Sequence, residues 1–308
     1  MGTEHRHGVD EVTITAEDGK TRASFIPEWG GIGSSLVLPF DGEPVETLYQ
    51  RDGFWDPKMD RTRGGLPYLF PICGRLERDG EAEIYLYGGQ RFRLPIHGFS
   101  LRVPWRMEQA SGDTIDLALS DTPATREAYP FSFELRVVWT VQPGRLLGEQ
   151  RLTNTGEGAL PFYAGFHPFF RTPPPGEGKE DVRVTLDAVR RLRYNRTLSD
   201  IAGDAPALTF PRPATDATLN ESLHEVTPGA AARVDLPDGR WITLRAGGDK
   251  RIGGFPFIQC YTVQDQPFFC VEPWMGHPNG LNTVCGTCLL APGASCTTTF
   301  EIAAGTVS

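Results

Sequence analysis

A glutamate in an apolar strand is the residue whose type and surroundings most directly suggest chemistry. The segment from Phe268 to Trp274 (FFCVEPW) reads as a β-strand. Side chains alternate along a strand, so Phe268, Cys270, Glu272 and Trp274 share one face. A carboxylate among apolar groups is costly unless it is paired or catalytic. Burial would raise the pKa of Glu272 toward the range of a general base. The alternative is a salt-bridged or rim-exposed glutamate at a strand end.

Three of the six histidines, His97, His167 and His277, lie in dense apolar or glycine-rich contexts. His167 precedes Pro168, and that position favours extended backbone, so its ring can project from a strand end. Histidine and glutamate are the usual groups of general acid–base catalysis. A core histidine bonded to a backbone carbonyl is the alternative. The three histidines and Glu272 are also residue types that bind zinc or iron. The sequence has no close pairing of ligands such as H-E-x-x-H.

The composition is that of a soluble globular protein, and it says little about the substrate. The 308 residues carry a net charge of −9 with a pI near 5.2, which argues against a nucleic-acid or anionic-membrane partner. The first twelve residues are polar, with no signal-peptide pattern, and no run approaches the ~18 apolar residues of a membrane span. We therefore expect a cytoplasmic protein.

The cysteines fit a reducing compartment. Cys73, Cys260 and Cys270 lie in apolar strand-like contexts and are expected to be buried thiols. Cys285 and Cys288 form a C-x-x-C, which could be a redox pair or half a metal site. The sequence has no second C-x-x-C, so neither function is favoured.

Alternating apolar residues recur along the chain and predict an all-β fold of antiparallel strands. Residues 131–141 form one long strand pattern, and residues 84–94 read as a hairpin that turns at Gly88 and Gly89. No sustained helical stripe is present, which favours a large sandwich. Pro173 to Lys179 is read as a stiff surface loop, either a simple connection or a roof over a cleft. Further strands are predicted at residues 115–119, 241–246, 257–263 and 296–302.

Four motifs resemble those of the aldose 1-epimerase (galactose mutarotase-like) superfamily, and their order along the chain matches the family as well. The resemblance runs from about residue 10 to residue 302 and predicts one domain over residues 10–302. The motifs are Arg63-Gly64-Gly65-Leu66-Pro67 through Pro71 with Gly74-Arg75, His97-Gly98-Phe99 followed by Trp105, Gly165 to Phe170, and Val271 to Trp274 with Asn279 and Asn282.

The resemblance implies a β-supersandwich with a concave sugar-binding cleft and a cofactor-free interconversion of α and β anomers. It makes Glu272 the general base and His167 the general acid. It also implies substrate contacts from His97 and Arg75, and from an aspartate for which Asp216 is the candidate. Trp274 and other aromatic side chains are expected to stack on the sugar.

The motifs depart from those of galactose mutarotases. The arginine motif reads Cys-Gly-Arg rather than Asn-Arg, and His167 is followed by Pro-Phe-Phe. The Arg-Gly-Gly-Leu-Pro segment is closer to the hexose-6-phosphate 1-epimerase branch, in which Arg63 and Arg75 would hold a phosphate. Because only four of the 30 basic residues are lysines, an arginine alone is weak evidence for phosphate.

We therefore expect an isomerase, monomeric or homodimeric, that acts on an aldohexose or its 6-phosphate. A non-catalytic sugar-binding or sugar-sensing module on the same fold is the alternative. A matched glutamate and histidine favour the enzyme, because a module that only binds sugar needs no acid–base pair.

Overall fold

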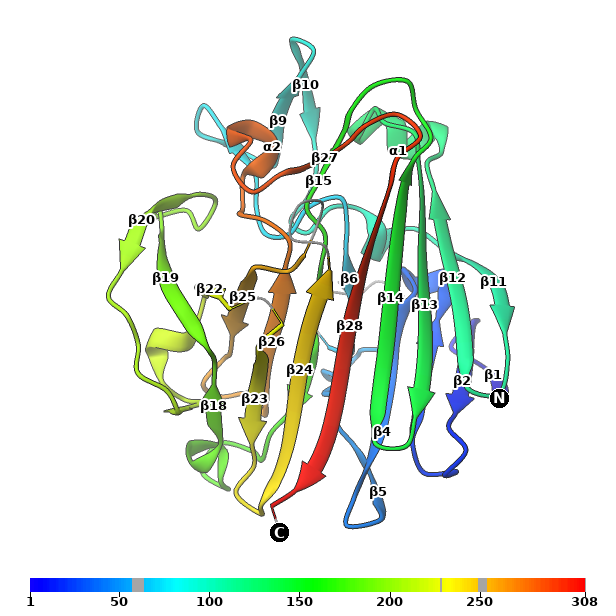
Figure 1. The fold of residues 1–308 in the computed structure, drawn as a ribbon, viewed down its shortest axis with the longest axis vertical. Helices are drawn as coiled ribbons and strands as arrows, with labels where there is room; N and C mark the ends of the chain where they lie inside the picture. The colour runs from blue at the N-terminus through cyan, green and yellow to red at the C-terminus, as the bar shows by residue number, and fades with distance from the viewer. Residues whose placement is uncertain (57–63, 228, 249–253, 308) are drawn as a thin grey trace.

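The structure, a computed structural model, describes residues 1–56, 64–227, 229–248 and 254–307. Within these ranges it is built almost entirely of antiparallel β-strands (Figure 1). The α-helices are α1 (Pro123–Ala128) and α2 (Gly280–Thr283), and the 3₁₀ turns are η1 (Pro27–Trp29), η2 (Ser100–Arg102), η3 (Lys179–Asp181) and η4 (Ala217–Leu219). No helix in the described part of the chain is long and apolar enough to cross a bilayer.

The largest sheet forms the front layer in Figure 1. In the described residues its strands are β11 (Arg106–Ala110), β12 (Thr114–Ser120), β13 (Phe133–Gln142), β14 (Arg145–Asn154), β18 (Arg183–Thr185), β21 (Arg212–Pro213), β23 (Ala231–Asp235), β24 (Arg240–Gly248) and β28 (Ser295–Thr306). They follow the spatial order β11-β12-β13-β14-β28-β24-β23-β18-β21.

A second sheet lies behind this layer and carries the strand with Glu272. Its strands are β6 (Tyr68–Leu69), β16 (Gly165–Phe166), β17 (Phe169–Arg171), β19 (Ala188–Tyr194), β20 (Ile201–Ala205), β22 (Ser222–Val226), β25 (Phe257–Tyr261) and β26 (Phe268–Trp274). They follow the order β20-β19-β22-β25-β26-β16-β6, and β17 also pairs with β26.

Residues 2–46 form a third sheet, whose strands pair in sequence order. They are β1 (Gly2–Arg6), β2 (Val9–Thr15), β3 (Arg22–Ile26), β4 (Ile32–Phe40) and β5 (Glu43–Glu46). Two-stranded pairs complete the described structure: β7 (Glu77–Arg78) with β8 (Glu81–Ala82), β9 (Ile84–Tyr87) with β10 (Gln90–Arg93), and β15 (Leu160–Phe162) with β27 (Cys288–Leu290).

The alternation of apolar side chains explains how the sheets pack. In β13 every second residue from Phe133 to Val141 is buried, so one face of the large sheet points into the core. Phe166 of β16 stacks on Phe300 of β28 with ring centroids 4.4 Å apart, which joins the second sheet to the first. Phe25 of β3 stacks on Trp139 at 5.3 Å and joins the third. Aromatic contacts between layers therefore fix the sheet that carries Glu272.

The all-β prediction is confirmed. β26 has the predicted bounds, the hairpin forms β9 and β10, and the other predicted strands are present as β12, β13, β24, β25 and β28. The polar N-terminal segment that contains His5 pairs as β1, so strand residues extend from Gly2 to Thr306. The expected burial of Cys73, Cys260 and Cys270 as free thiols is also confirmed.

Candidate active site

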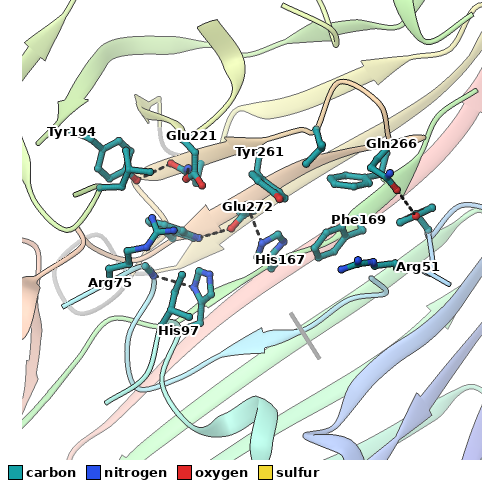
Figure 2. Close-up of a pocket in the computed structure, with 18 of the residues that line it drawn as sticks. Arg51, Arg75, His97, His167, Phe169, Tyr194, Glu221, Tyr261, Gln266 and Glu272 are labelled. Atoms are coloured by element: carbon teal, nitrogen blue, oxygen red, sulfur yellow. Dashed lines mark hydrogen bonds and ion pairs between the residues drawn. The ribbon is translucent and has the colours of Figure 1, made fainter. Parts of the chain in front are cut away.

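A cavity of about 470 Å³ opens over one face of the second sheet. Five of the seven residues predicted for the site line it, namely Arg75, His97, His167, Glu272 and Trp274. They come from β26 and from loops that are far apart in the sequence. Figure 2 shows His167 and Glu272 pointing toward one another at the centre of this group.

Strand pairing brings His167 and Glu272 together. On one side of His167, Gly165 pairs with Trp274, and on the other side Phe169 pairs with Cys270. The two pairings share one register, which places His167 directly opposite Glu272. Nε2 of His167 lies 3.3 Å from Oε1 of Glu272.

Both members of the pair are buried, with 5% of His167 and 1% of Glu272 exposed. The indole Nε1 of Trp274 donates a hydrogen bond to Oε2 of Glu272 at 3.2 Å. His167 stacks on Phe169, with parallel rings 4.4 Å apart, and its Nδ1 has no hydrogen-bond partner of good geometry. Packing and the indole hydrogen bond therefore fix the imidazole of His167 and the carboxylate of Glu272, with Nε2 facing Oε1.

The electrostatics of the pair favour a single shared proton. Burial raises the pKa of Glu272 well above its usual value, and the charge of Glu221 raises it further. Burial lowers the pKa of His167 to about 3. A carboxylic acid beside a neutral imidazole carries the same number of protons as a carboxylate beside an imidazolium. A carboxylate–imidazolium ion pair is therefore reached from the neutral pair by moving one proton across the 3.3 Å contact.

His97 reaches the cavity from a tight turn. Its φ is 63°, and the next residue is Gly98, where a Cβ would lie 2.2 Å from the carbonyl oxygen of Phe70. The Nδ1 of His97 accepts a hydrogen bond from the backbone N–H of Gly74 at 3.0 Å. Burial lowers the pKa of His97 well below its usual value, with smaller effects from nearby cations. The neutral ring therefore carries its proton on Nε2 and can donate it to a sugar oxygen.

Arg75 offers an available guanidinium at the same end of the cavity (Figure 2). Its carbonyl accepts a hydrogen bond from the N–H of Asn279, while its side chain has no hydrogen-bond or ion-pair partner among the described residues. Gly74 lets the backbone before Arg75 pack closely against Trp274, because a Cβ at Gly74 would lie 3.2 Å from the Trp274 ring. A guanidinium held this way can bond several hydroxyl oxygens or an anion.

One predicted residue, Asp216, is not brought to the cavity. Asp216 caps η4, where its carboxylate accepts hydrogen bonds from the N–H of Thr218 at 2.8 Å and from Nε of Arg212 at 2.6 Å. It is absent from the cavity lining, because local capping satisfies its oxygens elsewhere. Arg63 lies outside the described residues. His277, one of the alternative metal ligands, packs on Phe257 and also lies off the cavity.

Several lining residues were missed by the sequence analysis. Glu221 faces the cavity, and burial raises its pKa. Gln259 donates to Glu221 at 3.2 Å and accepts from the hydroxyl of Tyr194 at 2.9 Å. Gln259 is a polar residue in an apolar strand and pairs with Glu272, so the same pattern that singled out Glu272 could have found it. No comparable signal marks Glu221, which follows a loop.

Arg51 and Gln266 line the opposite end of the cavity (Figure 2), and Tyr49 is also a lining residue. The hydroxyl of Tyr49 donates to Oε1 of Gln266 at 3.0 Å. Arg51 is exposed, and its side chain has no hydrogen-bond or ion-pair partner in the described ranges. The proline-rich loop Pro173 to Lys179, considered as a roof, contributes no lining residue.

Comparisons with known proteins show which family the chain resembles. The family model for aldose 1-epimerase matches residues 12–250. Protein LacX (plasmid) from Lactococcus lactis subsp. lactis is 28% identical over 262 residues, which cover 80% of this chain and 83% of LacX.

Solved structures confirm the galactose mutarotase-like fold. The Slr1438 protein from Synechocystis sp. PCC 6803 is 27% identical with a TM-score of 0.79, and the match covers 96% of each chain. A galactose mutarotase related enzyme from Lactobacillus acidophilus is 21% identical with a TM-score of 0.76, covering 96% of this chain and 97% of that one. At that identity the likeness supports the fold alone. Together with the family match, these findings show that the chain belongs to the aldose 1-epimerase family.

Proposed function

We propose that the protein interconverts the α and β anomers of an aldohexose or its 6-phosphate. The observation that carries the proposal is the buried Glu272–His167 pair, 3.3 Å apart, in a cavity lined by further sugar-compatible donors. A carboxylate and an imidazole in contact can move a proton in each direction of one reaction.

The reaction is ring opening followed by closure. Glu272 takes the proton of the anomeric hydroxyl while His167 delivers its proton to the ring oxygen, and the C1–O5 bond breaks to leave an open-chain aldehyde. Rotation about C1–C2 presents the other carbonyl face. The C5 hydroxyl then attacks C1, its proton returns to His167, and Glu272 returns its proton to the new anomeric oxygen. No net proton is consumed.

The remaining lining residues would orient the sugar. His97 donates from Nε2, Arg75 holds hydroxyl oxygens, and Glu221 accepts from sugar hydroxyls. Phe268 and Trp274 cover the carboxylate and offer apolar faces to the C–H groups of the ring. Arg75 and Arg51 stand at opposite ends of the cavity, so either end can accept an anionic substituent such as a 6-phosphate.

Anomer-exchange NMR on purified protein tests the proposal. Free glucose, free galactose and glucose 6-phosphate are compared, with Glu272→Gln as the control. Exchange above the spontaneous rate that is lost in Glu272→Gln supports the epimerase, and the preferred sugar assigns the substrate. Sugar line-broadening without catalysed exchange would instead indicate a sugar-binding module.

A further inference from the structure

A third potential metal ligand lies beside the acid–base pair. Cys270 precedes Glu272 by two residues on β26 and therefore shares its face of the strand. One ligand atom each from His167, Cys270 and Glu272 lie within 4.8 Å of one another, and all three residues are buried. Among the described residues this is the group of histidine, cysteine and acidic side chains that is close enough to hold a metal ion.

The donor set suits zinc. Zinc binds thiolate sulfur, imidazole nitrogen and carboxylate oxygen in tetrahedral geometry, and three protein ligands leave a fourth position for solvent or a ligand. Ligand atoms around zinc lie about 3 to 4 Å from one another, which follows from bond lengths of about 2.0–2.3 Å. The His167–Glu272 distance of 3.3 Å already lies in that range, so binding requires only a small approach of the thiol.

The surroundings favour binding from the cavity rather than a permanent metal centre. His167 and Glu272 line the cavity, so an ion can reach them from solvent, while Cys270 lies beneath with Phe169 and Phe268. Trp274 already orients one Glu272 oxygen and leaves the other toward His167. Resident zinc histidines usually donate their second N–H to an acceptor, but Nδ1 of His167 has no such partner.

We propose that His167, Cys270 and Glu272 form a zinc-binding site whose occupation blocks the acid–base pair. Zinc takes one lone pair from each ligand. The thiol proton, and the carboxyl proton where it is present, leave to solvent. Burial and the charge of Glu272 raise the pKa of the Cys270 thiol. A coordinated thiol is nevertheless deprotonated by the charge of the metal.

The predicted inhibition rests on the proposed function, whereas metal binding does not. A zinc ion on Oε1 and Nε2 would occupy the atoms that exchange protons with the sugar. Inhibition is therefore expected to be competitive with sugar and to be reversed by a chelator. The two ideas can be tested with separate readouts.

Cobalt(II) serves as the spectroscopic probe for binding. It is titrated into EDTA-treated, dialysed protein, and the thiolate-to-cobalt charge-transfer band and the visible d–d bands are recorded. We expect both bands in the wild type, and we expect loss of the charge-transfer band in Cys270→Ser. Cys285→Ser is the matched control, because Cys285 is an exposed thiol whose Sγ lies 3.3 Å from Nδ1 of His277. This control should keep the band.

Three results would overturn the site: no thiolate band in the wild type at millimolar cobalt, a band unchanged in Cys270→Ser, or a band lost in Cys285→Ser. Circular dichroism and thermal unfolding check that Cys270→Ser folds, and Cys270→Ala is a second variant. Zinc inhibition of anomer exchange is then expected to weaken about tenfold or more in the folded Cys270 variant.

The outcomes separate the two proposals. A Cys270-dependent cobalt band in a protein that exchanges no anomers leaves the metal site standing and rejects the epimerase. Catalysed exchange without that band rejects the metal site and leaves the epimerase standing.

Discussion

The imidazole of His167 lies opposite the carboxylate of Glu272 across two strand pairings that share one register. The 3.3 Å contact between Nε2 and Oε1 lies at the wall of the cavity, where Phe169 stacks on the imidazole. Trp274 also holds the second carboxylate oxygen. Small chemical changes to either side chain should therefore alter proton transfer without altering the fold.

Replacing the carboxylate by an amide should abolish proton transfer while keeping the structure. Glu272→Gln is nearly isosteric, and its amide oxygen can still accept from the Trp274 indole. We expect turnover in anomer-exchange NMR to fall about 10²- to 10⁴-fold with little change in sugar affinity. Near-normal turnover in a folded variant would reject Glu272 as the base.

Because His167 and Glu272 share one proton, turnover should stay constant over a broad pH range. The active state needs one proton, which is lost only well above the ordinary glutamate pKa of 4.5 because burial favours the neutral acid. A second proton adds only in strong acid, since the pKa of His167 is lowered to about 3. Turnover of the EDTA-treated protein should therefore reach a plateau above about pH 3 and fall again only well above pH 4.5.

Initial rates at saturating sugar across the pH range measure this profile. Charged or titratable groups near the pair include Arg75, His97, Cys73, Cys260, Cys270, Tyr194, Tyr261 and Glu221. Glu221→Gln removes the nearest carboxylate charge and should shift the alkaline limb to lower pH, because that charge raises the pKa of Glu272. An alkaline limb near pH 4.5 in the wild type would contradict the assignment.

Glu221 should contribute to sugar binding, whereas Asp216 should not. Glu221→Gln removes a charged acceptor from the cavity lining, so we expect KM to rise about tenfold or more, as for a lost hydrogen bond to a charged group. Asp216→Asn is the matched control, because Asp216 caps η4 away from the cavity. It should change thermal stability without changing KM, and an equal effect of both changes on KM would reject the role of Glu221.

Lys179 should position one wall of the cavity. Its buried ammonium donates to the carbonyls of Val263 at 2.6 Å and Gln266 at 2.5 Å, and both residues line the cavity. Lys179→Met removes the ammonium donor from both carbonyls. Each carbonyl that stays buried without a partner should lower the free energy of unfolding by about 1–3 kcal/mol. We expect a less stable protein with a raised KM and an almost unchanged kcat.

The same lysine predicts a pH-dependent stability. Burial lowers the pKa of Lys179 from 10.5 to about 8, so between these values the unfolded chain binds more protons than the folded protein. The free energy of unfolding of the wild type should therefore rise relative to Lys179→Met as the pH increases from 8 to 10.5. Urea unfolding of both proteins measures the difference, and Lys20→Met, at an exposed lysine, should show no such trend.

Local sequence patterns determined the strands and the faces that they present. Alternation has a period of two residues, so FFCVEPW alone assigns Glu272 to the same face as Trp274 and Cys270, and β26 has those bounds. The polar Gln259 in an apolar strand carries the same kind of signal. The motifs that resemble aldose 1-epimerases also identified five residues that line the cavity.

Only the tertiary structure decided which side chains meet. The contact between His167 and Glu272 depends on the pairing of distant strands, and no local period encodes which strands pair. Glu221 enters the cavity because a loop delivers it there, whereas Asp216, five positions earlier, is satisfied by a local cap. A sequence pattern assigns a residue to a face, but long-range packing selects the partners across that face, since burial energy depends on the whole fold.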